Sequence, residues 1–216
     1  MDVVKILTYI LVLVVSSYIP LNSKDWTFFV NTHEIRMESS SVRKTSLWFK
    51  EKRDAMSMSN LSFFTTKTFV GPYKDTSILS YKNTKRWPVL YLSNSNVKIL
   101  KWNEIPNFNY SYMASGYPLL IHGGEKQKIY NTHFARRNCS RTAVGIMKNG
   151  NVLIFISSAA TLKRLQDKMY ELGCQSVLNL DGGSSTFVYI NGKEEYSSNK
   201  GNRYPNVLIW KTFPIK

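Results

Sequence analysis

Short apolar or alternating runs, separated by turn residues, predict a chain built mainly from β-strands. The predicted strands cover residues 26–31, 34–38, 55–59, 89–92, 97–102, 118–121, 128–130, 143–147, 152–156, 176–180, 186–190, 193–196 and 207–210. Two dipeptides, Asn149-Gly150 and Asn191-Gly192, suit two-residue hairpin turns, because both central residues of such a turn need φ > 0. Hairpins are also expected across residues 93–96 and 122–125.

Two segments have the 3.6-residue periodicity of an amphipathic helix. The first covers residues 41–53, where serines at its start offer N-caps and the apolar side chains Val42, Leu47 and Trp48 form the buried face. The apolar stripe of the second consists of Leu162, Leu165, Met169 and Leu172, and Gly173 follows as the C-terminal stop.

Residues 65–86 and 103–116 are polar or irregular and are expected to form loops. The pattern as a whole predicts a single α+β domain, with a mixed, largely antiparallel β-sheet rich in hairpins and two main α-helices.

The composition fits a globular domain with an anionic partner. The chain has 216 residues, of which 43% are hydrophobic, so it can bury a full core. Its formal net charge of +15 favours phosphodiesters, anionic polysaccharides, nucleic acids or anionic membrane surfaces as partners. The basic residues are scattered in short clusters and form no basic helix or run interleaved with aromatics, which argues against nucleic acid.

Residues 1–23 differ from the rest of the chain. Lys5 precedes an apolar run from Ile6 to Val15, and Pro20 ends any helix there, which is typical of a secretory signal peptide. An uncleaved membrane anchor and an ordinary buried segment are the alternatives. We therefore expect an exported protein, with residues 24–216 as its domain, that is secreted, periplasmic or held at a membrane by its N-terminal segment.

The two cysteines allow two interpretations. Cys139 and Cys174 each precede a predicted strand, so in an exported protein they can form a disulfide; two unpaired thiols are the alternative. Neither belongs to a Cys-x-x-Cys or Cys/His spacing that would indicate zinc, and no metal or cofactor is expected.

A polar, glycine-rich turn follows the predicted strand at residues 176–180. Asp181 is delivered at the carboxyl end of this strand, and Gly182 and Gly183 lack the Cβ atoms that would hold a ligand away from the backbone. Their N–H groups can converge on an anion, and the run Ser184 to Thr186 adds hydroxyls. The turn therefore suits a sugar or phosphate; a tight Asp-Gly loop, with Asp181 bonded to its own backbone, is the alternative.

Four stretches carry a resemblance to one family. Residues 179–186, Asn-Leu-Asp-Gly-Gly-Ser-Ser-Thr, contain an Asp-Gly-Gly-x-Ser signature, and residues 60–64 an Asn-x-x-Phe-Phe element. Residues 140–145 are similar to a Pro-Arg-Thr-Ala element, with Ser140 in place of proline, and residues 203–206 to an Arg-x-x-Asn element. In this order they resemble the phosphodiester glycosidases, which include the enzyme that uncovers mannose 6-phosphate on lysosomal glycoproteins and bacterial and phage relatives linked to exopolysaccharide.

The resemblance implies an exported hydrolase that cleaves a sugar-1-phosphodiester of the N-acetylglucosamine type to free sugar and a phosphomonoester. Asp181 would be the catalytic carboxylate, with Arg141 and Arg203 stabilising the departing phosphate. A surface or structural ion pair is the alternative for each arginine, and a turn-forming asparagine is the alternative for Asn60. The residues implied to bind substrate are Asn60, Thr142, Gly182, Gly183, Ser184, Ser185 and Asn206. The acids expected to be only solvated charges are Asp54, Asp75, Glu125 and Glu194, and the three histidines are expected to be structural or on the surface.

Two further expectations concern geometry and charge. The side chains of Asn60, Asp181, Arg141 and Arg203 should meet at one pocket. Two neighbouring arginines would lower the pKa of Asp181 below its ordinary value of about 3.9 unless burial opposes them, and a lowered pKa suits a nucleophile, a base or a metal ligand and excludes a proton donor. A second hypothesis is a non-catalytic anionic-polysaccharide binder or cell-envelope assembly protein on the same fold, because the motifs around Asn60 and Ser140 depart from the family's.

Overall fold

In the computed structural model, residues 25–45, 57–63, 73–74, 79–80, 87–93, 96–105, 112–199 and 203–211 are described. The predicted leader, residues 1–23, lies outside these ranges, as do Asp54, Phe64 and Asp75. Within the described ranges, residues 33, 38–45, 73–74, 79–80 and 203–206 are described by their backbone alone.

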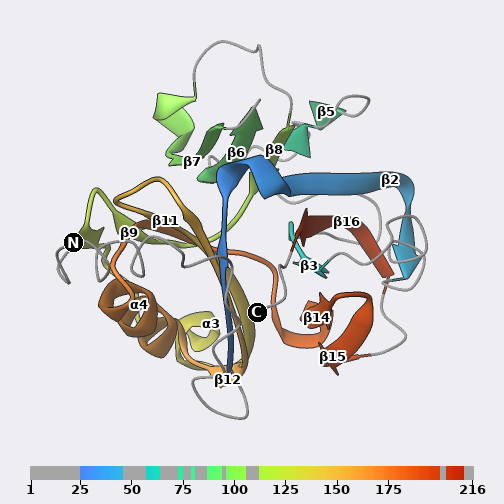
Figure 1. Ribbon diagram of the computed structural model, residues 1–216. Helices are drawn as coiled ribbons and strands as arrows, with labels where there is room; N and C mark the ends of the chain where they lie inside the picture. The colour runs from blue at the N-terminus through green and yellow to red at the C-terminus, as the bar shows by residue number, and fades with distance from the viewer. Residues whose placement is uncertain are drawn as a thin grey trace, which may run out of the picture.

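Three antiparallel β-sheets make up the domain (Figure 1). The first sheet has the order β1 (Asp25–Val30), β12 (Val152–Ala160), β11 (Cys139–Met147), β13 (Cys174–Asn179), β9 (Leu119–His122) and β10 (Glu125–Lys126). The second has the order β15 (Lys193–Ser197), β14 (Phe187–Ile190), β3 (Ser57–Asn60), β16 (Arg203–Trp210) and β2 (Ile35–Thr45). The third has the order β5 (Leu79–Ser80), β4 (Tyr73–Lys74), β8 (Tyr112–Ser115), β6 (Val89–Ser93) and β7 (Asn96–Leu100).

The helices described are short. They comprise α3 (His133–Arg136), α4 (Leu162–Glu171) and the 3₁₀ turns η1 (Thr32–Glu34), η2 (Trp102–Glu104) and η3 (Gly183–Ser185). The helix α4 begins where the Thr161 side chain accepts a hydrogen bond from the Arg164 N–H, and it ends before Gly173, which has φ +82°. Within the residues described, no helix has the length and apolar character needed to span a membrane.

Two apolar layers lie on opposite faces of the first sheet. On one face, Leu165 and Met169 of α4 pack against Leu153 and Val177. On the other face, side chains of all three sheets form one core, and they include Phe28, Ile154, Leu208, Leu90 and Val97. Figure 1 shows the same arrangement, with α4 on one side of β11 and β12 and the second sheet on the other. The first sheet is therefore buried on both faces, which explains its long apolar strands.

The predicted hairpins at the Asn-Gly dipeptides are present. Asn149-Gly150 lies between β11 and β12, and Asn191-Gly192 between β14 and β15, with φ values of 49° at Asn191 and 76° at Gly192. The strand-rich, antiparallel architecture with few helices agrees in outline with the predicted α+β class. Every strand pairing described is antiparallel, so the expected mixed character is not seen there.

Four local predictions were wrong. Within residues 65–86, expected to form a loop, residues 73–74 and 79–80 are the strands β4 and β5, which pair with each other. Residues 41–45, expected to begin a helix, belong to β2, because they pair with the start of β16 through Arg203↔Thr45 and Tyr204↔Lys44. Residues 112–115, expected in a loop, form β8, which pairs with β6. The strand β9 turns at Gly123 and Gly124 and pairs with Glu125–Lys126 instead of residues 128–130, since both glycines have positive φ and close a tighter turn.

Candidate functional site

The site is built where β11 begins and β13 ends. These two strands are neighbours and antiparallel, with Ala143 opposite Asn179, so the first residues of β11 lie beside the residues that follow β13. The Leu180 N–H donates to the Thr142 carbonyl at 2.9 Å, and the Asp181 N–H donates to the Leu61 carbonyl at 3.1 Å. Asp181 is thus fixed between the first sheet and the segment that follows β3 of the second.

Asn60 holds the Asp181 turn in place. Its Nδ2 donates to the Asp181 carbonyl at 2.5 Å, and its Oδ1 accepts from Thr142 Oγ1 at 2.9 Å and from the Phe187 N–H at 3.4 Å. Asn60 is 1% exposed and Thr142 is fully buried. The structure therefore brings two of the predicted substrate-binding residues, Asn60 and Thr142, to Asp181. Both are buried, so they position the turn from beneath the surface.

The two glycines of the turn serve different purposes. Gly182 is extended, and a Cβ at this position would lie 2.8 Å from the Ser140 carbonyl oxygen, so glycine permits close packing against β11. Gly183 has φ +60°, in the left-handed region that favours glycine, and starts η3. Ser184 is exposed, whereas Ser185 is buried. Only Ser184 of this pair presents its side chain to solvent.

The pKa of Asp181 is raised, contrary to the expectation. Burial of the carboxyl raises its pKa to about 7, although hydrogen bonds from the Ser185 side chain and the Gly182 backbone favour the ionised form. The Gly182 N–H donates to Asp181 Oδ1 at 2.9 Å, which is the contact that a tight Asp-Gly loop predicts. No charged side chain among the described residues contributes to the shift. Asp181 can therefore donate a proton near neutral pH.

Arg141 lies on β11, the strand beside β13, but its guanidinium donates hydrogen bonds to backbone carbonyls of other segments. It shares a sheet face with Ala143, which packs with α4, whereas Thr142 faces the second sheet. The Arg141 Nη2 donates to the carbonyls of Phe134 at 2.7 Å and Arg137 at 3.0 Å, and the Arg141 Nε donates to the Ala160 carbonyl at 3.3 Å. Burial lowers the pKa of Arg141, which is 1% exposed. The expected ion pair with Asp181 is thus not formed, because Arg141 anchors α3 to the sheet.

The remaining predicted residues lie around the same strands or outside the described parts. Arg203 and Asn206 belong to β16, whose Val207 pairs with Asn60, but their side chains are not among those described. The Glu194 carboxylate accepts a hydrogen bond from the Tyr189 hydroxyl at 2.9 Å, and Glu125 is exposed. Cys139 and Cys174 are both free thiols.

A row of aromatic rings beside the turn was not predicted as part of the site. Its members are Tyr117, Trp87, Phe63 and Phe134. Phe63 is part of the Asn-x-x-Phe-Phe element, and the other three lie outside the four motifs. Two of the four, Trp87 and Tyr117, directly precede prolines at the start of strands, which is the one sequence signal that sets them apart.

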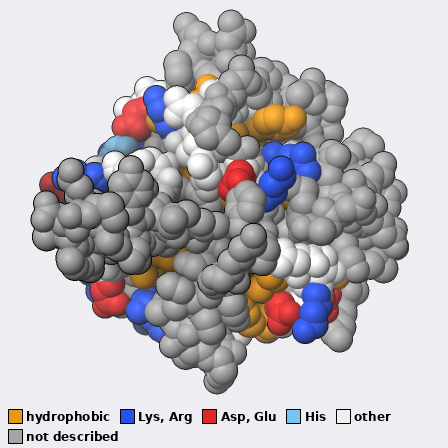
Figure 2. Space-filling model, viewed as in Figure 1, with side chains coloured by type: hydrophobic (Ala, Val, Ile, Leu, Met, Phe, Trp, Pro, Cys, Tyr) orange, Lys and Arg blue, Asp and Glu red, His pale blue; other side chains and the backbone are white. Residues whose placement is uncertain are grey.

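On the face drawn in Figure 2, the described Lys and Arg side chains lie in small separate groups, several of them beside acidic side chains. Among the described residues, no three His, Cys, Asp or Glu side chains gather in a group that could hold a metal ion.

Comparison with known proteins identifies the class to which this fold and site belong. A sequence model of the phosphodiester glycosidases matches residues 56–210, and the chain belongs to this family. The chain is similar to the solved catalytic domain of zebrafish N-acetylglucosamine-1-phosphodiester alpha-N-acetylglucosaminidase, auto-inhibited by its pro-peptide. That match has a TM-score of 0.70 and 16% identity over 92% of this chain and 82% of the other.

A second solved structure, a hypothetical protein from Synechocystis, matches with a TM-score of 0.65 and 14% identity over 91% of this chain and 61% of that one. Comparison with curated proteins gives no match. At these identities the two structures bear on the fold alone.

Proposed function

We propose that this protein hydrolyses a sugar-1-phosphodiester of the N-acetylglucosamine type and releases the free sugar and a phosphomonoester. The observation that carries the proposal is the Asp181 turn, where a carboxyl with a pKa of about 7 is held at the end of β13 by Asn60 and Gly182. A pKa near the working pH is the property that general acid catalysis needs. Membership of the phosphodiester glycosidase family and the net charge of +15 support an anionic sugar phosphate as substrate.

In the proposed reaction, the bond between the anomeric carbon and the phosphate oxygen breaks as water adds to that carbon. The protonated Asp181 carboxyl gives its proton to the departing phosphate oxygen, and the proton that the attacking water loses restores the carboxyl. One water molecule is consumed, and Asp181 ends in its starting state. Asp181 thus takes the acid role, which an ionised carboxylate cannot fill.

Arg141 supports this reaction through its charge and its hold on α3. Its guanidinium contacts backbone carbonyls, and no described carboxylate pairs with it, so its positive charge stays uncompensated within the described part of the chain. Such a charge favours the negative charge that develops on a departing phosphate nearby. Arg203 and Asn206, on the strand that pairs with Asn60, are proposed as additional substrate ligands, together with the exposed Ser184.

We also propose that the protein is exported, from the signal-like residues 1–23, and acts on exopolysaccharide or another envelope glycan. N-terminal sequencing of protein recovered from the medium or envelope tests cleavage. Intact protein that stays in the membrane fraction would indicate the anchor instead, and intact protein in the soluble fraction would contradict both forms of export.

The activity is tested with a synthetic N-acetylglucosamine 1-(methyl phosphate), followed by release of the free sugar. Turnover is expected, with kcat/KM falling as the pH rises above about 7, because Asp181 loses its proton there. Tight binding of the same compound without turnover at any pH would favour the alternative, a non-catalytic glycan binder. A rate that rises through pH 7 would contradict the acid role of Asp181.

A further inference from the structure

An aromatic row runs along the Asp181 turn. The Tyr117 and Trp87 rings are stacked, with centroids 5.1 Å apart and planes 21° apart. Trp87 meets the edge of Phe63 at 5.5 Å, and Phe63 meets Phe134 at 6.4 Å. The Arg141 guanidinium carbon lies 4.7 Å from the centre of the Phe134 ring and ends the row. From this row we infer that the protein binds the pyranose ring of its glycan by stacking it on these aromatic side chains.

The row is tied to the catalytic turn at two points. The Tyr117 N–H donates to the Asn179 carbonyl at 2.8 Å, and the Asn179 Nδ2 donates back to the Tyr117 carbonyl at 2.6 Å. Asn179 lies two residues before Asp181. On the other side, Phe63 lies two residues after Leu61, whose carbonyl accepts the Asp181 N–H. Two residues span at most about 7 Å, so a sugar on the row lies within reach of the Asp181 carboxyl.

Exposure distinguishes this row from ordinary core. Five large hydrophobic side chains are exposed among the described residues, and two of them, Tyr117 at 41% and Phe134 at 37%, belong to the row. Trp87 and Phe63 are half-buried. The rings at the two ends of the row thus present apolar area to solvent beside a polar turn, as a ligand site does.

The chemistry of a pyranose matches this surface. One face of the ring carries C–H groups with a slight positive charge, and the faces of aromatic rings are slightly negative, so the two attract when they stack. The hydroxyls at the sugar's rim stay free for the polar groups of the turn. A phosphate or a basic patch alone would not need four rings. The inference rests on the proposed hydrolysis, because it assigns the sugar half of the same substrate to the row.

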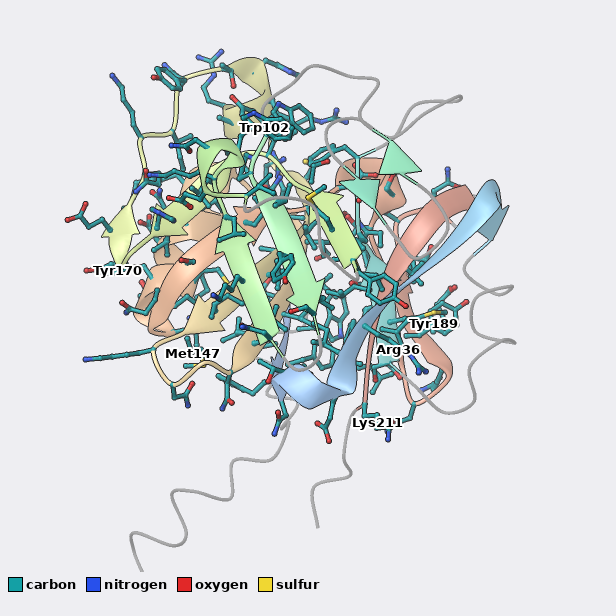
Figure 3. All side chains as sticks on the ribbon, turned by 90° about the horizontal axis from the view of Figure 1, so that it is seen from above. Arg36, Trp102, Met147, Tyr170, Tyr189 and Lys211 are labelled. Atoms are coloured by element: carbon teal, nitrogen blue, oxygen red, sulfur yellow. The ribbon has the colours of Figure 1, made fainter. Side chains whose placement is uncertain are left out.

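The test separates sugar binding from turnover. Binding of methyl N-acetylglucosaminide, which has no phosphate to release, is measured by calorimetry, and kcat and KM are measured with N-acetylglucosamine 1-(methyl phosphate). The variants are Tyr117→Ala and Phe134→Ala, with Tyr117→Phe as the variant that keeps the ring. Tyr170→Ala is the matched control, since Tyr170 is 48% exposed and lies on α4 at the edge of the molecule in Figure 3.

Tyr117→Ala and Phe134→Ala are expected to weaken sugar binding and to raise KM about tenfold each, which corresponds to about 1.4 kcal/mol. Tyr117→Phe, which keeps the ring, should retain most of the binding that Tyr117→Ala loses, and Tyr170→Ala should behave as the unchanged protein. Near-native thermal unfolding of Tyr117→Ala shows that the loss is not one of folding. If Tyr117→Ala and Phe134→Ala bind and turn over as Tyr170→Ala does, or if Tyr117→Phe loses binding as much as Tyr117→Ala, the stacking role is wrong.

The two proposals fail separately. In one outcome, Asp181→Asn abolishes turnover while Tyr117→Ala and Phe134→Ala bind the sugar unchanged. This outcome would support the proposed hydrolysis and contradict the stacking role of the row. In the other outcome, the protein shows no turnover, and both Tyr117→Ala and Phe134→Ala lose sugar binding. This outcome would support the stacking role of the row and contradict the proposed hydrolysis. Binding of a long-chain alkyl phosphate in preference to the sugar would assign the row to a lipid portion instead and overturn the inference.

Discussion

Asp181 and Asp167 are carboxylates of the same type in opposite environments. Asp167 lies on α4, accepts hydrogen bonds from Lys126 at 2.7 Å and from Lys163 at 2.6 Å, and has a lowered pKa chiefly because of these two lysines. Asp181 has no such partner among the described residues, and burial raises its pKa to about 7. The contrast separates an acid that organises the surface from one that can exchange a proton.

The largest expected effect comes from Asp181→Asn. The change keeps the shape of the side chain and an oxygen that can accept from the Gly182 N–H, but it removes the exchangeable proton. Turnover of the sugar phosphodiester should fall by about 10²- to 10⁴-fold, as for the loss of a general acid. Asp167→Asn is the control and should keep its kcat. Equal activity of the two variants would remove the distinction between the two acids.

The second effect concerns stability against pH. The unfolded Asp181 carboxyl ionises near pH 3.8 and the folded one near pH 7, so between these values the folded state holds a proton that the unfolded state has lost. The contribution of Asp181 to stability therefore falls as the pH rises from about 4 to about 7, and it stays constant above that. Asp181→Asn lacks this fall. The free energy of unfolding of Asp181→Asn minus that of the unchanged protein should therefore increase by about 2 to 4 kcal/mol between pH 4 and pH 8.

Urea unfolding at a series of pH values measures this difference. Asp167→Asn should show the opposite trend, because the lowered pKa of Asp167 stabilises the fold only above its unfolded pKa, and that contribution is lost as the pH falls. A pH-independent difference between Asp181→Asn and the unchanged protein would show that the Asp181 carboxyl has an ordinary pKa.

The third effect separates the two glycines of the turn. In Gly182→Ala the new Cβ would lie 2.8 Å from the Ser140 carbonyl oxygen, so the turn must move away from β11, at a cost of about 1 to 3 kcal/mol. In Gly183→Ala nothing lies within 4 Å of the new Cβ, and only the left-handed backbone is penalised, by about 1 kcal/mol. Chemical unfolding gives both values, and kcat should fall more in Gly182→Ala. The reverse order would mean that the turn does not depend on its packing against β11.

The smallest effect is expected at the surface acid. Asp167 is about one-third exposed and its lysine partners are solvated, so Asp167→Asn should cost less than about 1 kcal/mol at neutral pH. The loss should shrink further in concentrated salt, because salt screens exposed charges. A larger, salt-independent loss in thermal unfolding would place Asp167 among the structural residues.

The features that the sequence predicts well depend on neighbouring residues. The turns at Asn149-Gly150 and Asn191-Gly192 form because Gly150, Asn191 and Gly192 tolerate positive φ, and Gly173 ends α4 for the same local reason. Residues 41–45 have a helix-like local pattern, but their pairing with β16, from far along the chain, makes them a strand. The local pattern of residues 41–45 gives no information about this partner strand.

The same limit applies to the site. The motifs locate Asp181, Asn60 and Arg141 on converging strands. In the structure, the Asn60 side chain donates a hydrogen bond to the Asp181 carbonyl. Motifs do not tell which face of β11 carries Arg141, and its contacts with α3 depend on a helix of four residues that the sequence pattern did not predict. The pKa of Asp181 follows from burial by segments far apart in the chain, whereas the opposite direction was predicted from two motif residues, Arg141 and Arg203.

The packing of Gly145 against α4 and β13 has a practical consequence for chemical labelling. A Cβ at Gly145 would lie 2.6 Å from Cys174 Sγ, so this thiol is enclosed, and burial raises its pKa to about 12. Since the thiolate is the reactive form, Cys174 should resist maleimides at neutral pH. Cys139, half-buried two residues before Arg141, is the other cysteine of the chain. The unaltered protein thus offers a single attachment point for a fluorescent or spin label at the border of the Asp181 turn.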